Sequence, residues 1–159
     1  MSAQVGIIMG SKSDLEIMQA AADTLGEFDV EYEIRVVSAH RTPDEMNEYA
    51  KSAIERGLKV IIAGAGGSAH LPGMTASHTT LPVLAVPIKK NPHDHEALWS
   101  NIKMPPGVPL ATMPENGAKN AALMAVEILS IGDTDLLEKY QDFKRKQHDQ
   151  VISDDKSLQ

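Results

Sequence analysis

Three short segments in the first half of the chain carry side chains that could do chemistry. The candidate site residues are Gly10, Ser11, Ser13 and Asp14; Ser38, Ala39, His40 and Arg41; and Gly66, Gly67, His70 and Leu71. Hydroxyls, an arginine and free backbone N–H groups bind phosphate, and a carboxylate can accept the hydroxyls of a ribose. A histidine can carry a proton near neutral pH. The combination indicates a site for a phosphorylated small molecule beside an acid–base histidine.

Each segment follows a run of residues that is rich in β-branched side chains, as in a buried parallel strand. The runs are residues 5–9, 31–37 and 60–63. Because the carboxyl ends of parallel strands share one edge of a sheet, and ligands bind at that edge, we expect the three segments to converge on one crevice.

The remaining elements complete an alternating pattern. Further strands are expected within residues 82–87 and 108–112, and helices after residue 13, over 42–57 and over 117–131. Residues 13–16 and 42–45 match capping boxes, which mark helix starts. Strands that alternate with helices predict an α/β fold, namely a three-layer αβα sandwich around a parallel sheet. The length predicts a single domain over residues 1–159.

A last helix is expected at about residues 133–147, followed by a polar tail that frays. Its apolar face consists of Leu136, Leu137, Tyr140 and Phe143. This face could pack on the chain's own sheet or on a neighbouring subunit, and the sequence leaves both possibilities open.

Composition excludes several classes of protein. The formal net charge of −7 argues against a general nucleic-acid binder. The chain has no cysteine, so neither a disulfide framework nor a thiolate metal site is possible, which fits a reducing cytoplasm. No run approaches the roughly 20 apolar residues of a membrane helix, and we expect no signal peptide at residues 1–4.

Two weaker patterns favour plainer interpretations. Residues 64–69 fit the G-x-G-x-x-A form of a dinucleotide fingerprint, but they follow the third strand, so we interpret the glycines as a close backbone approach to a ligand. His93, Asp94 and His95 form only a partial metal-ligand set without a third strong ligand nearby in sequence. We expect a solvated loop there and no metal site.

Taken together, the motifs GSKSD, SAHRTP and AGAGGSAHLPGM resemble the PurE family, the N5-carboxyaminoimidazole ribonucleotide mutases of purine biosynthesis. The resemblance runs from about residue 5 to about residue 143. It implies a flavodoxin-like αβα sandwich and a homo-octamer with sites at subunit boundaries. It also implies no metal, no organic cofactor and no ATP. The HLPGM segment is similar to the bacterial-type mutase.

Roles follow from this resemblance, position by position. Ser11, Ser38 and Arg41 would hold the phosphate, and Asp14 the ribose. Gly66, Gly67 and His70 would line the pocket for the imidazole and the migrating carboxyl group, with Gly10, Ser13, Ala39 and Leu71 as further binding residues. His40 would be the proton shuttle that releases the N-carboxylate as CO2 and later removes the proton from ring carbon C4.

Two segments depart from the family pattern, namely residues 89–99 and 113–115, and both are expected near the mouth of the site. Two alternative functions stay open, of which only the second draws support from the 89–99 segment. One is direct CO2-dependent carboxylation of aminoimidazole ribonucleotide, against which the HLPGM segment argues. The other is a ribonucleotide-binding paralogue without efficient catalysis, which the retention of His40 beside Arg41 disfavours.

Overall fold

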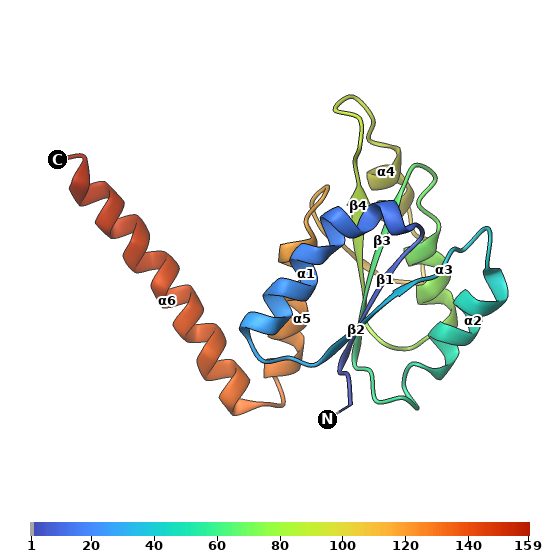
Figure 1. Ribbon diagram of the computed structural model, residues 1–159, viewed down its shortest axis with the longest axis horizontal. Helices are drawn as coiled ribbons and strands as arrows, with labels where there is room; N and C mark the ends of the chain where they lie inside the picture. The colour runs from blue at the N-terminus through green and yellow to red at the C-terminus, as the bar shows by residue number, and fades with distance from the viewer. Residues whose placement is uncertain (1) are drawn as a thin grey trace.

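A computed structural model describes residues 2–159 as a five-stranded parallel sheet between two layers of helices (Figure 1). The strands are β1 (Val5–Met9), β2 (Tyr32–Val36), β3 (Val60–Gly66), β4 (Val83–Ile88) and β5 (Ala111–Thr112). Their order is β2-β1-β3-β4-β5. This is the flavodoxin-like order, and its switch point lies between β1 and β3. The α/β prediction and the parallel sheet are confirmed.

The helices are η1 (Lys12–Asp14), α1 (Leu15–Glu27), α2 (Pro43–Ser52), α3 (Leu71–His78), α4 (Glu96–Ile102), α5 (Ala118–Ser130) and α6 (Thr134–Ser157). Successive side chains of β1 point to opposite faces of the sheet. Ile7 and Met9 pack into one core cluster with α1 and α5, whereas Ile8 packs into a second cluster with α2 and α3. The two clusters explain why the central strands are apolar throughout.

Several boundaries differ from the expected ones. The strand expected within residues 108–112 is paired only at Ala111 and Thr112, and the helix expected to end at Gly57 ends at Ser52. Helix α4 was not among the expected elements. Neither capping box forms: the N-cap of α1 is Asp14 rather than Ser13, and neither Asp14 nor Thr42 makes a side-chain cap bond.

Helix α6 is longer than expected, since residues predicted to fray remain helical through Ser157. Asp133 caps its start by accepting a hydrogen bond from the backbone N–H of Leu136 at 3.0 Å. Later turns carry helix-stabilising side-chain pairs such as Lys146–Asp142. The first turns pack on the body of the chain, and the rest of the helix projects away from it (Figure 1).

Leu136 and Tyr140 are both buried within the chain itself, where α6 packs on α5 rather than directly on the sheet. The ring of Phe28, at the end of α1, lies 6.1 Å from that of Tyr140 and 5.5 Å from that of Phe143. Leu137 remains 38% exposed.

Edge strand β2 leaves an apolar row uncovered. Tyr32, Ile34 and Val36 are in register with Val5, Ile7 and Met9 of β1 and so share their face of the sheet. The β1 side chains are fully buried, whereas Val36 is 53% exposed. Among residues 2–159, no helix combines the length and the apolar character needed to cross a bilayer.

Candidate active site

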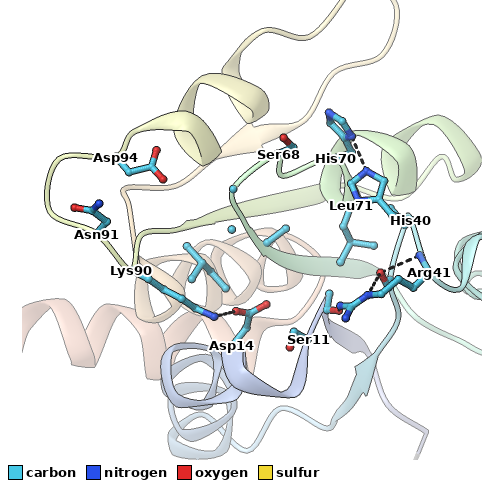
Figure 2. Close-up of a pocket in the computed structure, with 17 residues that line it drawn as sticks. Ser11, Asp14, His40, Arg41, Ser68, His70, Leu71, Lys90, Asn91 and Asp94 are labelled. Carbon is cyan, nitrogen blue, oxygen red and sulfur yellow. Dashed lines mark hydrogen bonds and ion pairs between the residues drawn. The ribbon is translucent and has the colours of Figure 1, made fainter.

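A cavity of about 520 Å³ lies at the carboxyl edge of the sheet. The residues around it are Gly10, Ser11, Asp14, Ser38, Ala39, His40, Arg41, Ala65, Gly66, Gly67, Ser68, His70, Leu71, Ile88, Lys90, Asn91 and Asp94. The three predicted segments therefore do converge, and every predicted site residue except Ser13 lines the cavity (Figure 2).

The segment after β1 is held by its own polar groups. Ser11 is the N-cap of η1, and its Oγ accepts a hydrogen bond from the backbone N–H of Ser13 at 3.3 Å. The two hydroxyls, Ser11 Oγ and Ser13 Oγ, lie 3.0 Å apart. The Asp14 carboxylate is buried, and Lys90 Nζ lies 2.9 Å from its Oδ1.

The segment after β2 is a turn closed by Thr42. Its Oγ1 accepts from the Ser38 N–H at 2.9 Å and donates to the Ser38 carbonyl at 3.2 Å. Thr42 thus closes this turn instead of capping α2. Arg41 donates from Nε to Ser38 Oγ at 3.3 Å and from Nη2 to the Gly10 carbonyl at 2.7 Å. Arg41 therefore joins the second segment to the first.

The segment after β3 needs its glycines for different reasons. A Cβ on Gly64 would lie 2.4 Å from Met18 Sδ, so this glycine serves core packing. Gly67 has a φ of +59°, a backbone conformation that favours glycine. A Cβ on Gly66 would lie 3.2 Å from the Ile88 carbonyl oxygen. Gly66 and Gly67 line the cavity, as the predicted close approach to a ligand requires.

Two histidines meet at the cavity wall. His40 Nε2 lies 2.7 Å from His70 Nδ1, and the rings are nearly perpendicular at 84° (Figure 2). Both side chains belong to exposed residues, so they are open to a ligand and to solvent. The arrangement places a proton-carrying pair next to the cationic Arg41.

The 89–99 segment does lie near the mouth of the site, as expected, but the sequence did not single out Lys90, Asn91 and Asp94, which line the cavity. Lys90 reaches back to Ser13 Oγ at 2.9 Å as well as to Asp14. A usable signal existed, because this loop follows β4 and so starts at the same edge of the sheet as the three predicted segments.

The two segments that depart from the family pattern contact each other. Glu115 is paired with Lys89 Nζ at 3.2 Å and with His95 Nδ1 at 2.7 Å. The side chain of Asn116 accepts a hydrogen bond from the Lys89 N–H at 2.8 Å and donates one to the Lys89 carbonyl at 3.0 Å. Desolvation opposes the charged form of Glu115, yet the hydrogen bonds from His95 and Lys89 hold its pKa below the ordinary value.

The partial metal-ligand set is not assembled into one cluster. His95 faces Glu115, whereas Asp94 lines the cavity and accepts from the Glu96 N–H at 2.8 Å. The expected solvated loop is therefore more tightly held than the sequence suggested. Within residues 2–159, no group of three histidine, aspartate or glutamate side chains is positioned to hold a metal ion.

Comparisons with known proteins identify the family of the chain. The model of the family described as AIR carboxylase matches residues 4–150. The N5-carboxyaminoimidazole ribonucleotide mutase of Thermotoga maritima is 53% identical over 150 residues, covering 94% of this chain and 88% of that protein. The mutase of the same name from Bacillus subtilis is 56% identical over 151 residues, covering 93% of both.

The chain is also similar to a carboxylase and to two solved structures. The phosphoribosylaminoimidazole carboxylase of Candida glabrata is 50% identical over 149 residues, covering 93% of this chain but only 26% of that protein. Two crystal structures of Treponema denticola PurE proteins superpose with TM-scores of 0.92 and 0.89 at 29% and 30% identity. They cover 100% and 98% of this chain, and 99% and 98% of their own chains. The predicted resemblance is thereby confirmed, and the chain belongs to the AIR carboxylase family.

Proposed function

We propose that this protein is an N5-carboxyaminoimidazole ribonucleotide mutase, an isomerase of purine biosynthesis that yields 4-carboxy-5-aminoimidazole ribonucleotide. One observation carries the proposal. The His40–His70 pair, with its 2.7 Å contact, stands directly beside Arg41 on the wall of one cavity. An acid–base group next to an anion-binding group is what a reaction on a phosphorylated substrate requires.

The nucleotide is assigned to the first two segments. Ser11, Ser38 and Arg41 bind the 5′-phosphate, because their hydroxyl and guanidinium groups line the same part of the wall. Asp14 accepts the ribose hydroxyls. Its carboxylate is buried, so it is already held in place before the ligand arrives. Gly10, Ser13 and Ala39 complete the binding segments.

The proton moves through His40. In the proposed reaction, His40 protonates the exocyclic nitrogen as its bond to the carboxylate breaks, which leaves an amine and CO2. Ring carbon C4 then attacks CO2 to form the new C–C bond, and His40 removes the C4 proton. His40 thus returns to its starting state, and the net reaction is an isomerisation with no proton gained or lost.

The third segment retains the CO2. Gly66, Gly67 and Leu71 contribute small and apolar groups to the wall of the cavity next to His70. His70 holds His40 in orientation through their hydrogen bond. Keeping CO2 close to C4 replaces a bimolecular recapture by an intramolecular step.

An assay with two alternative substrates tests the proposal. Product should form from N5-carboxyaminoimidazole ribonucleotide without added bicarbonate. Product formed only from aminoimidazole ribonucleotide and bicarbonate would instead establish the direct carboxylase, the activity in the name of the Candida glabrata relative. Binding without turnover of either substrate would establish the non-catalytic paralogue.

We further propose a cytoplasmic homo-octamer, with the octameric number taken from the family resemblance. The uncovered apolar row of Tyr32, Ile34 and Val36 on edge strand β2 supports subunit contacts, because an exposed edge of this kind invites association. A chain without cysteine suits a reducing compartment. Light scattering and cell fractionation test the two statements.

A further inference from the structure

Lys90 stands where a second cation could reach the nucleotide. It begins the loop after β4, yet its ammonium points back over the segment after β1 (Figure 2). Nζ lies 2.9 Å from Asp14 Oδ1 and 2.9 Å from Ser13 Oγ. An ammonium has three N–H donors and no acceptor, so these two contacts leave one donor for a ligand.

The same contacts direct a hydroxyl outward. Ser13 Oγ can only accept from Lys90, and the 3.0 Å contact between Ser13 Oγ and Ser11 Oγ uses one hydroxyl hydrogen. Ser11 Oγ also accepts from the Ser13 backbone N–H. Either hydroxyl can be the donor in this pair; where Ser13 donates to Ser11, the hydroxyl hydrogen of Ser11, which lines the cavity, is left for a ligand. Lys90 thus supports a site rich in donors, which suits an anion.

A cation flanks the first segment on each side. Arg41 Nη2 binds the Gly10 carbonyl at 2.7 Å, and Lys90 binds Ser13 and Asp14 further along the same segment. A phosphate monoester carries between one and two negative charges at neutral pH. The Lys90 side chain is 56% exposed, so it is free to adjust to a ligand, whereas the Asp14 side chain is only 6% exposed and fixed.

We propose that Lys90 is a second phosphate-binding cation, acting opposite Arg41 and donating its third N–H to the 5′-phosphate. This inference rests on the proposed function, since it takes the ribonucleotide as the ligand. It places a specificity determinant for the phosphorylated substrate in a loop that departs from the family pattern. The competing interpretation is that Lys90 only tethers Asp14.

Calorimetry on the full-length protein separates the two interpretations. The probes are 4-carboxy-5-aminoimidazole ribonucleotide and the corresponding nucleoside, which lacks the phosphate. Lys90→Met keeps most of the aliphatic stem and removes the charge. Losing a charge-assisted hydrogen bond should weaken nucleotide binding by about 10- to 150-fold, with a much smaller effect on the nucleoside. Nucleotide affinity should also fall less steeply with added salt in Lys90→Met than in the wild type.

Lys59→Met is the matched control, because Lys59 is exposed and precedes β3 at the opposite edge of the sheet. It should bind the nucleotide as the wild type does, and Lys90→Arg should retain most of the affinity. Equal weakening for nucleotide and nucleoside, or no weakening, in Lys90→Met would overturn the phosphate role. A wild-type protein that binds neither probe would overturn the proposed function itself.

Discussion

His40 and His70 face each other across the carboxyl edge of the sheet, with Nε2 of His40 2.7 Å from Nδ1 of His70. They follow β2 and β3, which are separated in the sheet by β1. At this distance one ring nitrogen must donate and the other accept, so two imidazolium rings cannot keep the contact. The pair is suited to hold one transferable proton, which is what a shuttle between nitrogen and carbon needs.

Replacing His40 by Asn should abolish most turnover. The Asn amide can still hydrogen-bond to His70, but it cannot exchange a proton with the substrate. Loss of general acid–base catalysis should lower kcat by at least about 10²- to 10⁴-fold, whereas the melting temperature should stay close to that of the wild type, since His40 is exposed. A purified variant with most of the wild-type activity would remove His40 from its assigned role.

Asp14→Ala and Arg41→Ala should mainly weaken nucleotide binding. Each removes a charge-assisted contact worth roughly 1.5–3 kcal/mol, so we expect affinities about 10- to 150-fold lower by calorimetry. Lys59→Ala, which removes a distant exposed charge, is the control. Unchanged affinity in both site variants would place the nucleotide elsewhere.

Much of this fold could be predicted because the central strands are buried on both faces, as the apolar runs of β1 and β3 indicate. The exceptions have local causes. Pro109 lacks a backbone N–H, and pairing in β5 is confined to Ala111 and Thr112. The polar tail of α6 lacks a core to pack on, but side-chain pairs between its turns keep it helical.

The part of the site that could be predicted from the sequence is the part that lies directly at the carboxyl ends of the strands. The rule that parallel strands end at one edge brought His40, Arg41 and His70 together. It could not show that Lys90 contacts Ser13, 77 residues earlier in the chain, because that contact depends on the path of the 89–95 loop. That path depends in turn on the contacts of Lys89 with Glu115 and Asn116, which no spacing in the sequence reveals.

Gly64→Ala should destabilise the fold. The added Cβ would lie 2.4 Å from Met18 Sδ and 2.9 Å from its Cε, so the side chain must move within a packed core. Overpacking of this kind costs about 1–3 kcal/mol, measurable by urea denaturation. Gly26→Ala in α1 is the control, because its Cβ would meet nothing within 4 Å, and it should be neutral or slightly stabilising. Equal stability of the two variants would contradict the packing argument.

Truncation before Asp133 should expose the ring of Phe28, which Tyr140 and Phe143 cover. We expect a lower melting temperature and either dissociation or aggregation by light scattering. A truncation after residue 147 keeps these rings and is the control for the fold. A wild-type protein that is monomeric at micromolar concentration would contradict the proposed oligomer.

Exhaustive chelation should leave the activity intact. The proposed chemistry needs no Lewis acid, because protonation of the exocyclic nitrogen by His40 already makes the N-carboxylate labile. Nothing is hydrolysed and no phosphoryl group moves, so neither magnesium nor ATP has a role. The measurement is product formation from N5-carboxyaminoimidazole ribonucleotide after dialysis against a strong chelator, with no nucleoside triphosphate present. His95→Gln serves as a companion variant, since this histidine faces Glu115 rather than the cavity. If activity disappears on chelation, returns with one divalent metal, and fails to return in His95→Gln, then the loop histidines are ligands and the proton-shuttle mechanism is wrong.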